Sequence, residues 1–393
     1  MIIVMFACSE KAYLLMQEVK ERWIKIHSED EIILLAKCRA LPQLSSDKSL
    51  AELAGEWFEK ADALVFVCAA GIAVRSIAPY LEHKSKDPAV LVMDEKGRFC
   101  ISLLSGHAGG ANELAGQLSE LFKDRGTIPV ITTATDMEGK FAVDDFARRN
   151  HLLLKDWQLA KMISVQILQG ERIRFMSDFP VCGEMPEELE YIAETQKSAP
   201  EMEDEKKEDQ HGIRVSFRKS RCFSKKQLQL TPTALVVGIG CRKDTPEVQI
   251  ERAVNECFRE EGLLPDGIAA FASIDLKKQE KGILAYCEKR KLPFFVYSKE
   301  ELAQVEGVFT ASVFVEEVTG VDNVCERSAV LGAFHWSREK TTGGRIKTEQ
   351  EKTEREKQNS EKEQKQCVRL ITGKKCYDKV TIAVAAVIEE LYF

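Results

Sequence analysis

The sequence lacks the cysteine spacing of common metal and redox motifs. Its twelve cysteines are spread over 393 residues, and no two stand in C-x-x-C spacing. That removes the usual zinc, iron–sulfur and thioredoxin-like signatures, so we expect no metal held by the protein. Several cysteines, Cys68 and Cys257 among them, lie in apolar segments. Buried reduced thiols fit a cytoplasmic protein better than a disulfide framework.

Three further absences narrow the class of function. The net charge of -7 lacks the basic excess of nucleic-acid-binding domains, although local basic loops can still bind an anion. The longest apolar run, Ala63–Val74, is too short to span a bilayer, so we expect no membrane partner. No G-x-S-x-G elbow is present, which counts against a serine esterase.

What the sequence does contain is alternating strand and helix patterns. Apolar runs at Ile2–Ala7, Leu64–Ala69 and Ala234–Ile239 are typical of buried strands, and Ser298 with Glu301 predicts a capping box. We predict an α/β protein of two α/β domains with mostly parallel sheets, joined by a smaller, partly mobile middle region. The predicted parts are 1–136, 137–230 with an acidic linker at 184–210, and 231–393 with a charged insertion at 337–366.

The segment Ser105–Asn112 is the most informative loop. Its glycines allow a ligand to approach the backbone closely, and it leads directly into a helix whose exposed amides favour an anion or oxyanion. His107 is a candidate proton-transfer residue because imidazole is a common general acid or base, although a structural tie in the loop is the simpler role. We count Ser105 as a second catalytic candidate. We expect the other residues of the loop to contact the substrate: Gly106, Gly109, Gly110 and Asn112.

Two other N-terminal segments follow predicted strands. Gly71 and Arg75 come after one strand, where a guanidinium suits carboxylate recognition and a surface ion pair is the plainer alternative. Thr132 and Thr133 follow another predicted strand, and we expect their hydroxyls to contact the substrate. Asp136 is a candidate base or a group that orients His107, with helix capping as the simpler role.

The C-terminal part has comparable loops. Gly238 and Gly240 predict a tight turn, but Lys243 stands where a dinucleotide fingerprint needs its third glycine. With Cys241, Arg242 and Lys243 the segment is better interpreted as an anion-binding turn. The remaining candidates are polar clusters for which ion pairs within the fold are an equal explanation: Asp275, Lys277, Glu326 and Arg327.

At these segments the sequence resembles the cobalt-precorrin-5A hydrolase (CbiG-type) family. The resemblance covers motifs in chain order over most of the sequence, and the acidic middle segment and Ser337–Gln366 depart from it. The motifs that carry it are Gly71–Pro79, Leu103–Asn112, Thr132–Asp136, Gly238–Arg242, Ala272–Lys277, Ser298–Leu302, Val324–Ala329 and Leu370–Val384.

The resemblance implies hydrolysis of a δ-lactone on a cobalt-containing macrocycle and loss of a two-carbon fragment as acetaldehyde. It implies no cofactor, because the conjugated ring serves as electron sink and the cobalt arrives with the substrate. The partner is then an anionic cobalt-corrinoid intermediate, with neighbouring pathway enzymes as further partners. Two alternatives stay open, a non-catalytic tetrapyrrole-binding protein that hands over an intermediate and a general esterase or lactonase.

Overall fold

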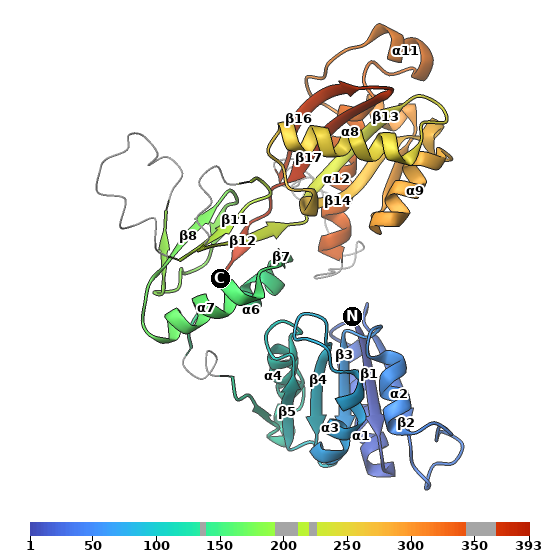
Figure 1. Ribbon diagram of the computed structural model, residues 1–393. Coiled ribbons are helices and arrows are strands. Elements are labelled where there is room, and N and C mark those ends of the chain that lie inside the picture. Colours follow the sequence, from blue (N-terminus) through green and yellow to red (C-terminus); the bar gives the residue numbers. More distant parts are fainter. Residues whose placement is uncertain (134–138, 193–210, 220–225, 343–366) are drawn as a thin grey trace. The chain divides into compact units, whose positions relative to one another are not determined.

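The protein is described from a computed structural model, which covers residues 1–133, 139–192, 211–219, 226–342 and 367–393. Within these ranges the strands form one six-stranded sheet, two five-stranded sheets and a two-stranded pair, with helices between them (Figure 1). The predicted α/β class is confirmed.

The N-terminal sheet has the strand order β2-β1-β3-β4-β5-β6. Its elements in chain order are β1 Ile2–Ala7, α1 Glu10–Ile24, β2 Glu31–Ala36, α2 Leu50–Trp57, β3 Ala63–Val67, α3 Ala70–Ile77, η1 Ala78–Tyr80, β4 Ala89–Met93, β5 Phe99–Leu104, α4 Ala111–Leu121, η2 Lys123–Arg125 and β6 Ile128–Val130; α6 Val143–Arg149 follows.

Helices cover both faces of this sheet because its central strands are apolar on both sides. Ile3 and Met5 of β1 pack with buried side chains of α1 and α4, whereas Val4 and Phe6 pack with those of α2 and α3. Successive side chains of a strand point to opposite faces, so a continuous apolar run needs two layers of helices.

Strand direction changes between β4 and β5. Strands β1 to β4 are parallel, β5 pairs antiparallel with β4, and β6 is parallel to β5. The carboxyl ends of β1 to β4 therefore lie at one edge of the sheet, and those of β5 and β6 lie at the opposite edge.

The middle sheet has the order β10-β8-β11-β12-β7. Part of the predicted acidic linker belongs to it, because Leu189 is buried in β10 and the ring of Tyr191 lies 6.3 Å from that of Phe175. Residues 193–210 of that linker lie outside the described residues. The elements are β7 Leu152–Leu154, α7 Trp157–Leu168, β8 Ile173–Ser177, β9 Val181–Cys182, β10 Leu189–Tyr191, β11 Gly212–Val215 and β12 Gln227–Pro232.

The C-terminal sheet has the order β15-β14-β13-β17-β16, with β13, β14 and β15 parallel. Helix α8 crosses one face, and α12 covers the other (Figure 1). The elements are β13 Leu235–Cys241, α8 Glu247–Glu260, η4 Pro265–Gly267, β14 Ile268–Ile274, η5 Asp275–Lys277, α9 Lys281–Arg290, β15 Phe294–Tyr297, α10 Lys299–Ala303, α11 Val313–Thr319, α12 Cys325–Thr342, β16 Val368–Tyr377, β17 Val380–Val387 and β18 Leu391–Tyr392.

Gly238 and Gly240 lie inside β13 and form no turn, which corrects the sequence prediction. A Cβ on Gly238 would stand 1.8 Å from the carbonyl oxygen of Cys325 and 2.7 Å from the amide of Ala329. The glycine is thus required because the start of α12 passes directly over β13. In the sequence the glycine pair indicated a ligand-binding turn, whereas Gly238 is there because another backbone packs closely against the strand.

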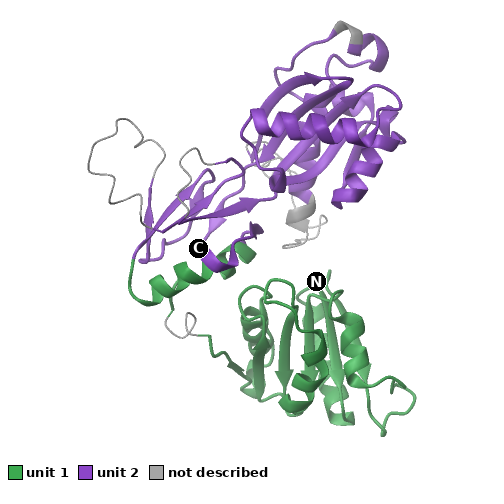
Figure 2. Cartoon of the chain, in the orientation of Figure 1, with its two compact units in different colours: residues 1–149, 160–171 green, residues 150–159, 172–393 purple. Residues whose placement is uncertain are grey.

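The first residues of the predicted charged insertion 337–366 belong to a helix. Residues up to Thr342 belong to α12, and Ser337 is buried. Residues 343–366 lie outside the described residues. The chain divides into two compact units, Met1–Arg149 with Ala160–Glu171, and Asn150–Leu159 with Arg172–Phe393 (Figure 2).

Candidate functional site

The loops after β13 and β14 bring five of the predicted residues to one edge of the C-terminal sheet. Cys241 ends β13, and Arg242 and Lys243 follow it with exposed side chains. Asp275 and Lys277 form η5 directly after β14. Parallel strands place their carboxyl ends at the same edge, where α/β sheets bind ligands. This group, here called the basic edge, offers three cations to an anion.

Glu280 connects the two loops of the basic edge and was not predicted from the sequence. Its Oε2 lies 3.2 Å from Nζ of Lys277, and its Oε1 accepts a 2.7 Å hydrogen bond from the amide of Asp244. The Glu280 side chain is only 7% exposed, so the pair is shielded from solvent. Because no motif marks Glu280, only the meeting of the two loops could reveal it.

Cys241 is a poor nucleophile at this edge. Burial raises the pKa of its thiol, and the nearby Lys277 ammonium only partly opposes that effect. The thiol therefore stays protonated near neutral pH. We therefore interpret Cys241 as a small side chain that packs between the two loops.

Glu326 serves the fold, since internal donors occupy its carboxylate. Glu326 is 1% exposed, and both its oxygens accept from Thr310, through the amide at 2.7 Å and the hydroxyl at 2.9 Å. The Asn323 amide and the backbone N–H of Lys374 also donate to it, at 2.9 and 2.6 Å. A buried carboxylate needs such donors. Here they tie the start of α12 to β16.

Arg327 is engaged in the same way. Its guanidinium donates to Asp322 at 2.8 Å and to the carbonyls of Leu302 and Val305 at 3.1 and 2.8 Å. It also lies over the ring of Phe309, 4.7 Å from the centroid. These contacts close the end of α10, and the prediction that Arg327 contacts substrate stays untested.

In the N-terminal unit the loop Ser105–Gly110 closes on itself. The carbonyl of Ser105 accepts 3.1 Å bonds from the amides of Gly109 and Ala111, and the carbonyl of Gly106 accepts from Asn112 at 3.0 Å. Ser105 has a φ of 55°, and its hydroxyl donates to the carbonyl of Asp87 at 3.0 Å. The first amides of α4 are thus engaged within the loop, contrary to the expected open anion site.

The glycines of this loop are needed for its own packing. A Cβ on Gly106 would stand 2.6 Å from Oδ1 of Asn112, and one on Gly109 would stand 2.5 Å from the Cβ of Ser105. Gly110 has a φ of 82°. The glycine-rich composition therefore reflects a tight turn at the start of α4.

Arg148 of α6 and Thr133 fix the two sides of the loop. Arg148 donates through Nε to the carbonyl of His107 at 2.9 Å, and it is held by Glu113 and Asp145 at 2.6 and 2.8 Å. Nδ2 of Asn112 donates to the hydroxyl of Thr133 at 3.1 Å. His107 is half-buried. Thr132 is exposed next to Thr133, and Asp136 lies outside the described residues.

Gly71 and Arg75 lie at the other edge of the N-terminal sheet. Gly71 lies in the first turn and Arg75 in the last turn of α3, which follows β3, whereas the His107 loop follows the reversed strand β5. Arg75 is exposed and donates through Nη1 to the carbonyl of Gly71 at 3.0 Å. The structure therefore does not bring these two predicted groups together.

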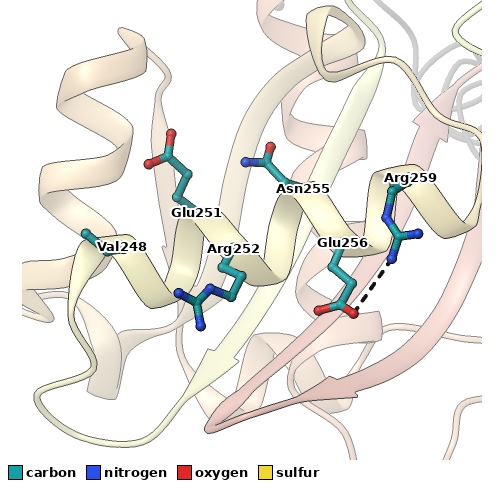
Figure 3. Close-up of a pocket in the computed structure, with 6 residues that line it drawn as sticks. All are labelled: Val248, Glu251, Arg252, Asn255, Glu256 and Arg259. Atoms are coloured by element: carbon teal, nitrogen blue, oxygen red, sulfur yellow. Dashed lines mark ion pairs between the residues drawn. The ribbon is translucent and has the colours of Figure 1, made fainter.

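A hollow on the exposed side of α8 contains none of the predicted residues. Figure 3 shows its six lining side chains, all from that helix, with Glu256 and Arg259 3.8 Å apart as an ion pair. Charges of both signs alternate along it, and no loop of the basic edge reaches it. We do not assign the site to this hollow.

Within the described ranges no group of three or more His, Cys, Asp or Glu side chains has the arrangement of a metal site. Among the helices in the same ranges, none combines the length and apolarity needed to cross a membrane.

Comparison with known proteins relates the chain to cobalamin biosynthesis. Family models described as Cobalamin synthesis G N-terminal and Cobalamin synthesis G C-terminus match residues 52–136 and 235–385. A cobalt-precorrin-5A hydrolase from Salmonella typhimurium is 34% identical over 294 residues, 72% of this chain and 80% of that protein. One from Priestia megaterium is 29% identical over 70% of this chain and 73% of that protein.

A solved structure of a cobalamin biosynthesis protein G homologue from Sulfolobus solfataricus is 20% identical, with a TM-score of 0.38 over 98% of this chain and 97% of that chain. The N-terminal match includes Gly71, Arg75 and the His107 loop, and the C-terminal match includes the basic edge. On the two family matches and the 34% identity, the chain belongs to the CbiG family of cobalamin biosynthesis proteins.

Proposed function

We propose that this protein is a cobalt-precorrin-5A hydrolase, which opens the δ-lactone of its substrate and releases acetaldehyde. The observation that carries the proposal is the 34% identity to a hydrolase of that name over 80% of the relative's length. The expected product is cobalt-precorrin-5B. The reaction belongs to the anaerobic route to cobalamin, as the family resemblance implies.

The basic edge supports recognition of a substrate rich in carboxylates. Arg242 and Lys243 are exposed, and Lys277 is held in place by Glu280. A guanidinium binds a carboxylate through two parallel hydrogen bonds, and ammonium groups add point charges. We assign these three cations to the acidic side chains of the macrocycle.

The chemistry requires a base, oxyanion donors and an acid. Water adds to the lactone carbonyl, and the ring C–O bond breaks to give a carboxylate and a hydroxyl group. Loss of the hydroxyl proton then breaks the adjacent carbon–carbon bond, acetaldehyde leaves, and the electron pair passes to the macrocycle until a proton reaches the ring carbon. Cobalt enters as part of the substrate, and we propose that no organic cofactor takes part.

We assign the water-activating role to His107. Its loop is held by Arg148 and by the Asn112–Thr133 contact, and positioning of a base requires such contacts. Ser105 is engaged with the carbonyl of Asp87, which favours a supporting role over nucleophilic attack. Asp136 remains the alternative base. We further propose a cytoplasmic location beside enzymes that supply and consume the intermediate.

The decisive experiment is to incubate the purified chain with cobalt-precorrin-5A and to measure acetaldehyde with an alcohol dehydrogenase and NADH. We expect one acetaldehyde per macrocycle consumed. Cobalt-precorrin-5B, which has already lost the two-carbon fragment, is the control for non-specific fragmentation. Binding seen as an absorbance shift, without acetaldehyde, would instead identify a hand-over protein. Turnover of simple chromogenic esters would identify a general esterase.

A further inference from the structure

Two cysteines that the sequence analysis did not connect are neighbours in the fold. Ala7 of β1 and Val67 of β3 are register partners in adjacent parallel strands, and Cys8 and Cys68 are the next residue of each. Adjacent strands lie about 4.8 Å apart, which falls within the roughly 4.4–6.8 Å Cα separation of disulfides. Both side chains belong to the cluster under α2 and α3, so they point to the same face.

The two thiols differ in exposure and in proton affinity. Cys68 is buried, with Sγ 3.5 Å from the carbonyl of Ala69, and Cys8 is half-buried. A hydrogen bond from the Cys68 thiol lowers the pKa of Cys8 to about 7, against the opposing effects of burial and of Glu95. The same bond and burial raise the pKa of Cys68. The outer thiol is thus partly ionised near neutral pH, and the inner thiol carries the proton.

The other buried thiols form a contrast. Burial raises the pKa of Cys100, Cys287 and Cys325 to about 12 each. A thiolate is the attacking form in disulfide exchange. Among these thiols Cys8 is therefore the one that attacks, and proximity gives Cys68 the position of the second thiol.

We propose that Cys8 and Cys68 form a thiol–disulfide exchange site for low-molecular-weight disulfides. The Cys8 thiolate attacks one sulfur of the small disulfide, forms a mixed disulfide and releases one small thiolate. Cys68 then loses its proton, attacks Sγ of Cys8 and displaces the second small thiol. The small disulfide is reduced by two electrons as the Cys8–Cys68 bond forms.

The site lies where β1 and β3 end and α3 begins. A Cys8–Cys68 bond ties β1 to the segment that leads into Gly71 and Arg75. This inference does not depend on the proposed lactone chemistry, because its reactants and its readouts are different.

The test uses the full chain treated with glutathione disulfide at pH 7.5, followed by thiol titration and peptide mapping. We expect the thiol count to fall from twelve to ten and a Cys8–Cys68 peptide pair to appear. In Cys68→Ser the mixed disulfide should persist on Cys8, because the resolving thiol is missing. Cys38→Ser, at the same sheet edge, should behave as the unmodified protein. Oxidation spread over other cysteines, or no adduct on Cys8 of Cys68→Ser, overturns the proposal.

A second measurement follows the rate of Cys8 alkylation by iodoacetamide against pH. We expect a midpoint of about 7 in the unmodified protein. Cys68→Ala removes the donor to the thiolate, so the midpoint should rise towards the ordinary thiol value of about 8.5. An unchanged midpoint would show that the thiols do not interact. Both readouts are independent of acetaldehyde release, so a failure of the proposed function leaves this test intact.

Discussion

The two large sheets at the ends of the chain carry similar polar loops but distribute them differently. In the C-terminal sheet β13, β14 and β15 are parallel, and the loops after the first two meet at the basic edge. In the N-terminal sheet the reversal at β5 sends the His107 loop to one edge and leaves Gly71 and Arg75 at the other. The edge of the sheet at which a loop lies can therefore be predicted only when the direction of the preceding strand is known.

The comparison also separates two uses of glycine. In the N-terminal loop, Gly106 and Gly109 make room for the turn before α4. In the C-terminal sheet, Gly238 makes room for a helix over a strand. Composition marked both sets as ligand loops, and in both the structure shows that the glycines are needed for packing.

Replacement of Gly238 should have the largest effect. In Gly238→Ala the new methyl group overlaps the Cys325 carbonyl, so the free energy of unfolding should fall by about 3 kcal/mol. Denaturant unfolding followed by circular dichroism measures it. Gly116→Ala in α4, where no atom lies within 4 Å, should instead stabilise by roughly 0.5–1 kcal/mol. A stable Gly238→Ala with weakened substrate binding would restore the ligand-loop interpretation.

The next effect tests whether the reversed edge of the N-terminal sheet is catalytic. His107→Asn keeps hydrogen bonding but removes the imidazole proposed to transfer the proton, so turnover should fall by about a hundredfold with little change in thermal stability. Acetaldehyde release under saturating substrate is the measurement. His83→Asn, a histidine in the exposed loop before β4, is the matched control and should retain turnover. If His107→Asn turns over normally, the histidine is a structural tie and Asp136 becomes the candidate.

A smaller effect compares the cations of the two sheets. Arg242→Gln should raise KM about tenfold and leave kcat unchanged, because it removes a charge-assisted contact to the substrate. The difference should shrink as salt rises, since Arg242 is exposed. Arg75→Gln should give a smaller rise, since one of its donors already serves the Gly71 carbonyl. If both variants raise KM equally, both sheets contribute to substrate binding to the same degree. Arg290→Gln is the control and should leave KM unchanged.

The smallest effect uses a feature that the two units share. Ser49 with Glu52 and Ser298 with Glu301 form capping boxes at the starts of α2 and α10. Ser49→Ala and Ser298→Ala should each lower the free energy of unfolding by about 1 kcal/mol. If the free energy of unfolding of either variant falls by only about a tenth of that amount, the short helix is held by packing alone.

The stabilisation that these two capping boxes provide depends on pH. The amide and hydroxyl of Ser298 lower the pKa of Glu301, and the hydroxyl and amide of Ser49 lower that of Glu52. Because both folded pKa values are depressed, the stabilisation is complete above the unfolded pKa of about 4.3 and is lost as pH falls through the folded value. Thermal unfolding at pH 7 and below pH 4 should show a smaller difference between each variant and the unmodified protein at the lower pH.

Local patterns predicted the local elements well. The capping box at Ser298 and Glu301 is confirmed, as is the apolar strand Ile2–Ala7. The linker prediction fails at Leu189 because one buried side chain in a charged segment is enough to add a strand to a sheet edge. The candidate loops were predicted as residue types, and the residue that holds each loop, Glu280 in one unit and Arg148 in the other, carries no motif.

The sequence by itself determined the α/β class, the family and the chemical character of the loops, because periodicity, caps and ordered motifs are properties of neighbouring residues. Only the tertiary structure decided which loops meet, which glycines serve packing and which thiols are neighbours. Strand order and direction join residues far apart in the chain, as Cys8 joins Cys68. Nothing in local spacing encodes that pairing, since it depends on how whole strands bury their two faces.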